Sequence, residues 1–145
     1  MWKPVNFVVF ATLIEDRKMA AGVCGAAVLH LGCTAIGLPG WPCPLLSALG
    51  VPCPGCGLSR GTLALLRGEV GRAMTLHAFA PVLLGAVTLL FAAAVLKPDA
   101  RQRLSETVHE IEIRTRITVW MLLALLAYWT LRFALDGKRF IALVT

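Results

Sequence analysis

The longest uncharged stretch lies in the first half of the chain, where residues 19–59 contain no Asp, Glu, Lys or Arg. About 20 helical residues cross the hydrocarbon core of a bilayer, so this stretch is longer than one span requires. Prolines and glycines crowd its second part, and a proline inside a helix costs about 3 kcal/mol. The pattern therefore predicts a first transmembrane helix over residues 19–38, followed by a Pro/Cys-rich turn over residues 39–57.

Two further apolar stretches have the length of a span. Residues 76–96 are uncharged, and Pro81 lies in the first turns, where a missing amide is tolerated. Residues 117–135 carry Trp120 near one end and Tyr128 and Trp129 near the other, as in an aromatic belt. We predict an all-α integral membrane protein with three transmembrane helices, formed as a single membrane domain over residues 1–145.

Composition supports this fold class. The chain is 58% hydrophobic and 15% charged, and its mean hydropathy is +0.77. These values exclude an ordinary soluble domain. The net charge of +6 comes from basic residues that flank apolar segments, with no aromatic-basic motif for nucleic acid. We interpret the charge as membrane orientation and contact with anionic lipid.

The polar segments lie between and outside the spans. Residues 4–14 are apolar but too short to span, so we expect residues 1–18 to lie at the membrane interface. Residues 97–116 form a charged loop that carries a short surface helix, on which His109 is solvated. Residues 136–145 are a tail. Basic residues before the first span and within 97–116 place both segments on the cytoplasmic side of the membrane, and the Cys turn on the outer face.

Residues 58–74 predict a short amphipathic or re-entrant helix. Arg60 and Arg67 are seven positions apart and share its polar side. Small residues beside them allow another backbone to approach closely, in this chain, in a partner or in a second copy of the chain. They are Gly57, Gly61, Ala64, Gly68 and Gly71.

A Cys-x-x-Cys knuckle, Cys53-Pro54-Gly55-Cys56-Gly57, precedes this helix. One interpretation is a structural zinc or iron site, with Cys43 as the third ligand and His77 as the fourth. A second is a disulfide between Cys53 and Cys56, either structural or active in thiol-disulfide exchange, with Arg60 supporting the thiolate. A third is a packed turn of free cysteines.

The first span contains three more residues that could bind a ligand. They are Cys24, His30 and Cys33. An intramembrane histidine is more often hydrogen-bonded to a neighbouring helix than bound to a cofactor, and we expect this of His30.

The motif Cys-Pro-x-Cys-Gly-x-Ser-Arg over residues 53–60 resembles the hallmark of a bacterial family of small membrane proteins, domain of unknown function 2752. Residues 65–68 and 77–81 fit the same family, and residues 128–133 look like its closing aromatic-arginine element. The resemblance covers residues 36–133. It implies a shared fold and site, but no established activity.

No chemistry beyond the cysteines points to an enzyme. All acidic residues lie in loops or termini, and no phosphate loop or nucleophile elbow is present. We expect a non-enzymatic accessory or assembly subunit of a larger membrane complex. The alternative is a membrane thiol-disulfide oxidoreductase that uses Cys53 and Cys56.

Overall fold

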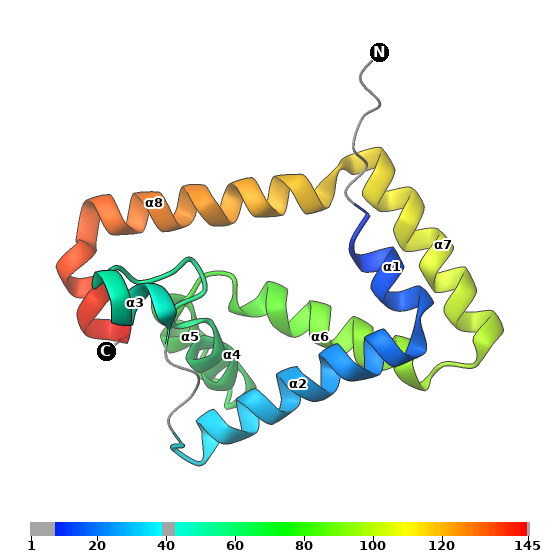
Figure 1. Cartoon of the computed structure of the whole chain (residues 1–145), viewed down its shortest axis with the longest axis horizontal. Helices are drawn as coiled ribbons and strands as arrows, with labels where there is room; N and C mark the ends of the chain where they lie inside the picture. The colour runs from blue at the N-terminus through cyan, green and yellow to red at the C-terminus, as the bar shows by residue number, and fades with distance from the viewer. Residues whose placement is uncertain (1–7, 39–42, 145) are drawn as a thin grey trace. The chain divides into compact units, whose positions relative to one another are not determined.

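The computed structural model describes the backbone of residues 8–38 and 43–144, and side chains as far as residue 135 (Figure 1). The described residues form eight helices and no strand, which confirms the all-α prediction. The helices are α1 (Phe10–Glu15), α2 (Arg17–Ala35), α3 (Pro44–Leu49), α4 (Leu58–Leu66), α5 (Val70–Leu76), α6 (Ala80–Val95), α7 (Pro98–Thr115) and α8 (Ile117–Val144).

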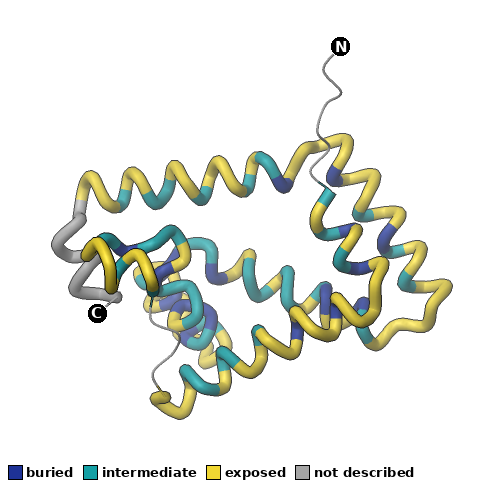
Figure 2. The backbone as a smooth tube through the Cα atoms, in the orientation of Figure 1, coloured by how far each residue is buried: buried dark blue, intermediate teal, exposed yellow. Residues whose placement is uncertain are grey.

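Two described helical segments are long and apolar enough to cross a membrane, Arg17–Ala35 and Ile117–Leu135. The helices α5 and α6 meet at a bend of 102°. Among the described residues, a third candidate span is obtained only if these two helices are counted together. The bend falls where His77 adopts an extended backbone, and α6 alone has 16 residues. Many residues of α2 and α8 are exposed within the chain (Figure 2), as expected of helices that face lipid. The described helices are those of a membrane protein, with two candidate spans, or three if the bent pair is one span.

The chain forms two compact units, and the first comprises Met1–Gly25 and Val87–Ala124. In it the short helix α1 lies beside α7 (Figure 1). Ile14 is fully buried, and its apolar cluster includes Leu90, with Leu104 and Val108 of α7 packed against it. The apolar residues of the N-terminal segment therefore pack against the charged segment, whose 18-residue helix begins at Pro98.

Glu112 joins three elements of this unit. Its carboxylate accepts hydrogen bonds from the amides of Val9, Phe10 and Ala11, at 3.2, 3.0 and 2.9 Å, and from the Thr118 hydroxyl at 2.6 Å. These amides belong to the first turn of α1, where backbone donors lack intrahelical partners. A carboxylate at this position also complements the helix dipole. Glu112 is 3% exposed and holds the start of α1 against α7.

The second unit comprises Ala26–Ala86 and Leu125–Thr145. Its helices α4 and α5 occupy the segment that the sequence predicts as one helix over residues 58–74. Gly68 divides the two with φ +78°, a conformation that glycine adopts without strain. The Glu69 and Gly68 amides donate to the carbonyls of Ala64 and Leu65, which closes the end of α4.

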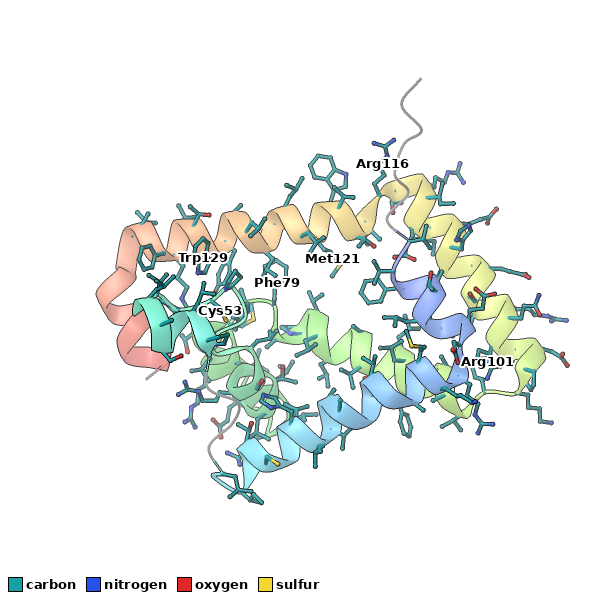
Figure 3. The ribbon with its side chains drawn as sticks, in the orientation of Figure 1. Cys53, Phe79, Arg101, Arg116, Met121 and Trp129 are labelled. Carbon is teal, nitrogen blue, oxygen red and sulfur yellow. The ribbon has the colours of Figure 1, made fainter. Side chains whose placement is uncertain are left out.

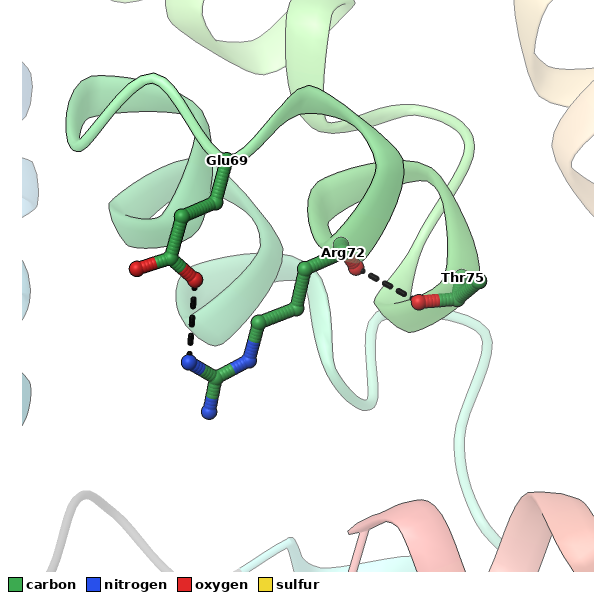
Figure 4. A network of polar contacts seen from close by, with 3 residues as sticks. All are labelled: Glu69, Arg72 and Thr75. Atoms are coloured by element: carbon green, nitrogen blue, oxygen red, sulfur yellow. Dashed lines mark hydrogen bonds and ion pairs between the residues drawn. The ribbon is translucent and has the colours of Figure 1, made fainter.

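The start of α5 has its own polar contacts (Figure 4). Arg72 forms an ion pair with Glu69 at 2.9 Å, and the Thr75 hydroxyl donates to the Arg72 carbonyl at 2.8 Å. Both partners of the ion pair are exposed, so this pair contributes only a few tenths of a kcal/mol, on the order of other exposed i,i+3 pairs.

Gly61 lies where α4 meets the next helices. A Cβ atom there would lie 3.3 Å from the Ala73 carbonyl oxygen and 3.3 Å from the Ala80 Cβ. Gly61 and Ala64 are buried within the chain. Gly68 and Gly71 have no atom within 4 Å of such a position, and Gly57 is the left-handed residue that precedes α4. The small residues therefore divide into two that form an intrachain contact and three glycines that lie at turns or on the surface.

Candidate metal centre

Cys43 lies at the N-terminus of α3, where the chain enters the helix. Its backbone is extended, Pro44 is the first helical residue, and the Ser47 amide donates to the Cys43 carbonyl at 2.9 Å. The first amides of a helix are free to bond a side chain at this position. The Leu46 and Cys53 amides donate to the Cys43 sulfur. The Pro-Cys-Pro context thus places one sulfur where two backbone donors meet it.

Cys53 and Cys56 form a tight turn that leads into α4. The Cys56 amide donates to the Cys53 carbonyl at 3.0 Å, and the Leu58 amide donates to the Gly55 carbonyl at 3.1 Å. Gly57 follows with φ +88° and lets the chain turn into the helix. The two sulfurs are 3.3 Å apart and form no disulfide.

The structure brings the three predicted cysteine ligands together. The sulfurs of Cys43, Cys53 and Cys56 all lie within 4.8 Å of one another. Two sulfurs bound to one tetrahedral zinc ion at about 2.3 Å are about 3.8 Å apart, so this spacing fits a shared ion after small adjustments. Cys56 is buried, whereas Cys43 and Cys53 are half-buried. The site can therefore be reached from outside.

His77, the predicted fourth ligand, is not a member of this group. Its Nε2 donates to the Pro54 carbonyl at 2.9 Å, and its Nδ1 accepts from the Phe79 amide at 3.2 Å. Both ring nitrogens are thus engaged, and the histidine is fully buried. His77 therefore supports the peptide group between Pro54 and Gly55, within the turn that carries the sulfurs.

Trp129 of α8 supports the peptide group on the other side of Cys53. Its indole Nε1 donates to the Pro52 carbonyl at 2.7 Å. Its ring packs with Leu46 against the buried Cys56. Figure 3 shows Trp129 close to Cys53. The carbonyl groups before and after Cys53 are therefore both held by buried or half-buried side chains from distant parts of the chain.

Arg132 and Tyr128, one turn apart on α8, hold the segment that carries His77. The Arg132 guanidinium donates to the carbonyls of Thr75 and Leu76, each at 2.7 Å, at the C-terminal end of α5. A cation at a helix C-terminus is favourable. The Tyr128 hydroxyl accepts from Arg132 at 2.7 Å and from the Ala78 amide at 3.3 Å. These bonds fix the bend between α5 and α6.

The three thiols differ in acidity. Burial raises the pKa of Cys43, but hydrogen bonds from the Leu46 and Cys53 amides and from the neighbouring thiols outweigh burial and lower its pKa from 9.0 to about 7. Burial, together with hydrogen bonds to the other two sulfurs, raises the pKa of Cys56 to about 12. The Cys43 thiol is therefore more acidic than the Cys56 thiol.

The remaining predicted positions lie in other contexts. Arg60 is exposed in the first turn of α4, and Arg67 is exposed at the end of that helix. Cys24 and Cys33 are free thiols on α2, outside the three-cysteine group. His30 Nε2 and the Ser59 hydroxyl are 2.9 Å apart, which confirms that His30 bonds a neighbouring helix.

From the sequence, Tyr128 and Trp129 were expected in an aromatic belt, and no role in the site was predicted for them or for Arg132. A signal was available, because one face of α8 carries an indole N–H, a phenol and a guanidinium within two turns. Three such donors at a span end indicate contact with backbone carbonyls as readily as an aromatic belt.

Comparison with known families supports the importance of the cysteine segment. Residues 43–91 match the family model described as protein of unknown function DUF2752. This match confirms, over residues 43–91, the resemblance that the cysteine motif predicts. The matched region contains the three cysteines, Gly61 and His77, whereas the supporting residues of α8 lie outside it. No curated protein and no solved structure matches the chain.

Proposed function

We propose that this chain is a small integral membrane protein that holds one thiophilic metal ion at Cys43, Cys53 and Cys56 and acts as an accessory subunit of a larger membrane complex. The observation that carries the proposal is the mutual approach of three sulfurs within 4.8 Å. Two of these sulfurs come from one turn, and the third comes from the start of another helix.

A merely packed turn accounts poorly for this arrangement. Free cysteines that act as small hydrophobic residues are buried, whereas Cys43 and Cys53 are half-buried. Backbone amides are directed at the Cys43 sulfur, as in sites that stabilise a thiolate. In metal sites, residues around the ligands also form hydrogen bonds that orient those ligands. His77 and Trp129 form such hydrogen bonds with the residues on both sides of Cys53.

Thiol exchange is a second candidate function, favoured by the 3.3 Å separation of the Cys53 and Cys56 sulfurs. Oxidation to a disulfide would bring the sulfurs to about 2.05 Å with little movement of the turn. An incoming thiolate that attacks such a disulfide would form a mixed disulfide with one of the two sulfurs and release the other as a thiolate. This reading requires an external electron acceptor, for which a membrane quinone is the natural class.

Thiol mapping separates the two functions. Chain purified in mild detergent is alkylated without metal and with one equivalent of zinc or of cuprous copper, and each cysteine is located by peptide mass analysis. A metal site protects Cys43, Cys53 and Cys56 together, while the labelling of Cys24 and Cys33 does not change. An exchangeable disulfide instead hides Cys53 and Cys56 until a reductant is added, and Cys43 labels in both states. Equal labelling under all conditions contradicts both functions.

The accessory role rests on the lack of other chemistry. Neither candidate span, Arg17–Ala35 or Ile117–Leu135, contains an acidic residue that could serve an ion or proton pathway. Mass spectrometry of chains that co-elute from a mild detergent tests this role. A reproducible membrane partner at constant stoichiometry supports it, whereas elution as the isolated chain with lipid alone contradicts it. Location in a bacterial inner membrane, with the cysteine turn outward, remains part of this proposal.

A further inference from the structure

We propose that the site formed by Cys43, Cys53 and Cys56 takes a soft monovalent ion of the cuprous class, bound by three sulfurs alone. This inference rests on the proposed metal-binding function and specifies its ion. It differs from a zinc or iron centre, which the cysteine spacing on its own also allows. The identity of the ion depends on which atoms around the three sulfurs are still able to bind a metal.

No fourth protein ligand joins the group among the described residues. The two histidines of this unit are engaged elsewhere, since His77 uses both ring nitrogens and His30 pairs with Ser59. A structural zinc site is almost always closed by four protein ligands. The described part of the chain supplies only three, and all of them are thiols.

The backbone carbonyls of the site are also occupied. The Cys43 carbonyl accepts from the amide and hydroxyl of Ser47, and the Cys53 carbonyl accepts from the Cys56 amide. The carbonyls of Pro52 and Pro54 accept from Trp129 and His77. Each of these oxygens already uses at least one of its two lone pairs in a hydrogen bond. The turn therefore presents sulfur to an ion and little oxygen.

The surroundings of the sulfurs are apolar on one side. Leu46 and Trp129 pack against Cys56, and neither side chain offers a lone pair to a metal. A water molecule that completes a zinc site needs polar partners of its own, and this side of the cluster provides none. Three coordinating sulfurs and an apolar cover suit an ion that prefers soft ligands and low coordination number.

Ligand softness then selects the ion. Thiolates favour cuprous copper, zinc and iron-sulfur clusters over hard cations. Of these, zinc requires a fourth ligand, and a cluster with the usual ligation requires four cysteines. Cuprous copper is satisfied by three thiolates, so it is the ion that the three sulfurs bind without help from outside the chain.

Competition between two ions tests the inference on the full chain in detergent without oxygen. The chain is loaded with one equivalent of zinc, one equivalent of cuprous copper is added, and the bound metals are measured after gel filtration. We expect copper to replace zinc at one ion per chain. X-ray absorption at the copper edge should show three sulfur neighbours and no nitrogen or oxygen neighbour.

Two variants complete the test. Cys43→Ser should weaken cuprous binding by at least about 100-fold, the upper end of what outer-sphere changes alone cause. Cys33→Ser, a thiol outside the group, should leave binding unchanged. If Cys43→Ser does not fold, as judged by circular dichroism, the wild-type competition and ligand count decide. Retention of zinc, or a copper site with a nitrogen or oxygen ligand, overturns the inference and leaves the proposed function standing. Failure to hold either ion overturns both.

Discussion

Replacement of Trp129 by phenylalanine tests whether α8 organises the cysteine turn. The substitution keeps an aromatic ring against Cys56 but removes the 2.7 Å hydrogen bond from the indole to the Pro52 carbonyl. Pro52 is buried, so this carbonyl loses its donor away from water. A buried polar group left without a partner costs about 1–3 kcal/mol. We expect Trp129→Phe to lower the free energy of unfolding by that amount.

The same change should act on the site. Loss of a bond that orients a ligand typically weakens metal binding by about 10–100-fold. Chelator competition measures this affinity, and thermal unfolding in detergent measures the stability. Trp120→Phe is the matched control, because Trp120 lies on the same helix and is 65% exposed. If Trp129→Phe and Trp120→Phe behave alike in both assays, α8 does not organise the turn.

Three further predictions concern other parts of the chain. Gly61→Ala should lower the free energy of unfolding by about 1–3 kcal/mol, because the added methyl group overpacks against Ala73 and Ala80. Gly71→Ala, in open space, should be neutral or stabilising. Equal melting temperatures of the two variants would refute the contact. Hydrogen bonds from Thr118 and from backbone amides outweigh burial and lower the pKa of Glu112 below its usual 4.5. The stability that Glu112 contributes is therefore complete above pH 4.5 and is lost as the pH falls through the lower pKa of the folded state. Glu112→Gln should reduce the loss of unfolding free energy at acid pH, and an unchanged dependence of that free energy on pH would contradict this. The alkylation rate of Cys43 in metal-free chain should rise with a midpoint near pH 7, matching its pKa of about 7, and a midpoint near 9 in peptide mass analysis would exclude the stabilised thiolate.

Apolar length and proline placement predict much of the fold. The uncharged stretches predict the two long apolar segments of α2 and α8 because span length and hydropathy are properties of a local sequence. The break at Gly68 was not predicted, because a glycine inside a periodic pattern is compatible with either a helix or its end. The bend at His77 depends on bonds from α8, over 50 residues away, which no local pattern contains.

The three cysteines of the candidate site could be predicted from the sequence, but the roles of the residues that support them could not. Cys43 and Cys53 each lie between two prolines. This shared context correctly indicated Cys43 as a neighbour of Cys53 and Cys56. The same reasoning assigned His77 as a ligand because a histidine near cysteines is a common metal ligand. Its placement under Pro54 follows from tertiary packing. Glu112 was predicted to lie in a loop like the other acidic residues, although its position four residues after Val108 places it on the apolar side of α7.

The most direct test of the metal centre is the metal-to-protein ratio of the chain purified in mild detergent without chelator. Wild type and Cys33→Ser should each carry one thiophilic ion per chain, and Cys43→Ser, Cys53→Ser and Cys56→Ser should each carry none. This result follows if three sulfurs within 4.8 Å share one ion. A wild-type chain that carries no ion, also after incubation with one equivalent of zinc or cuprous copper, would contradict the metal centre.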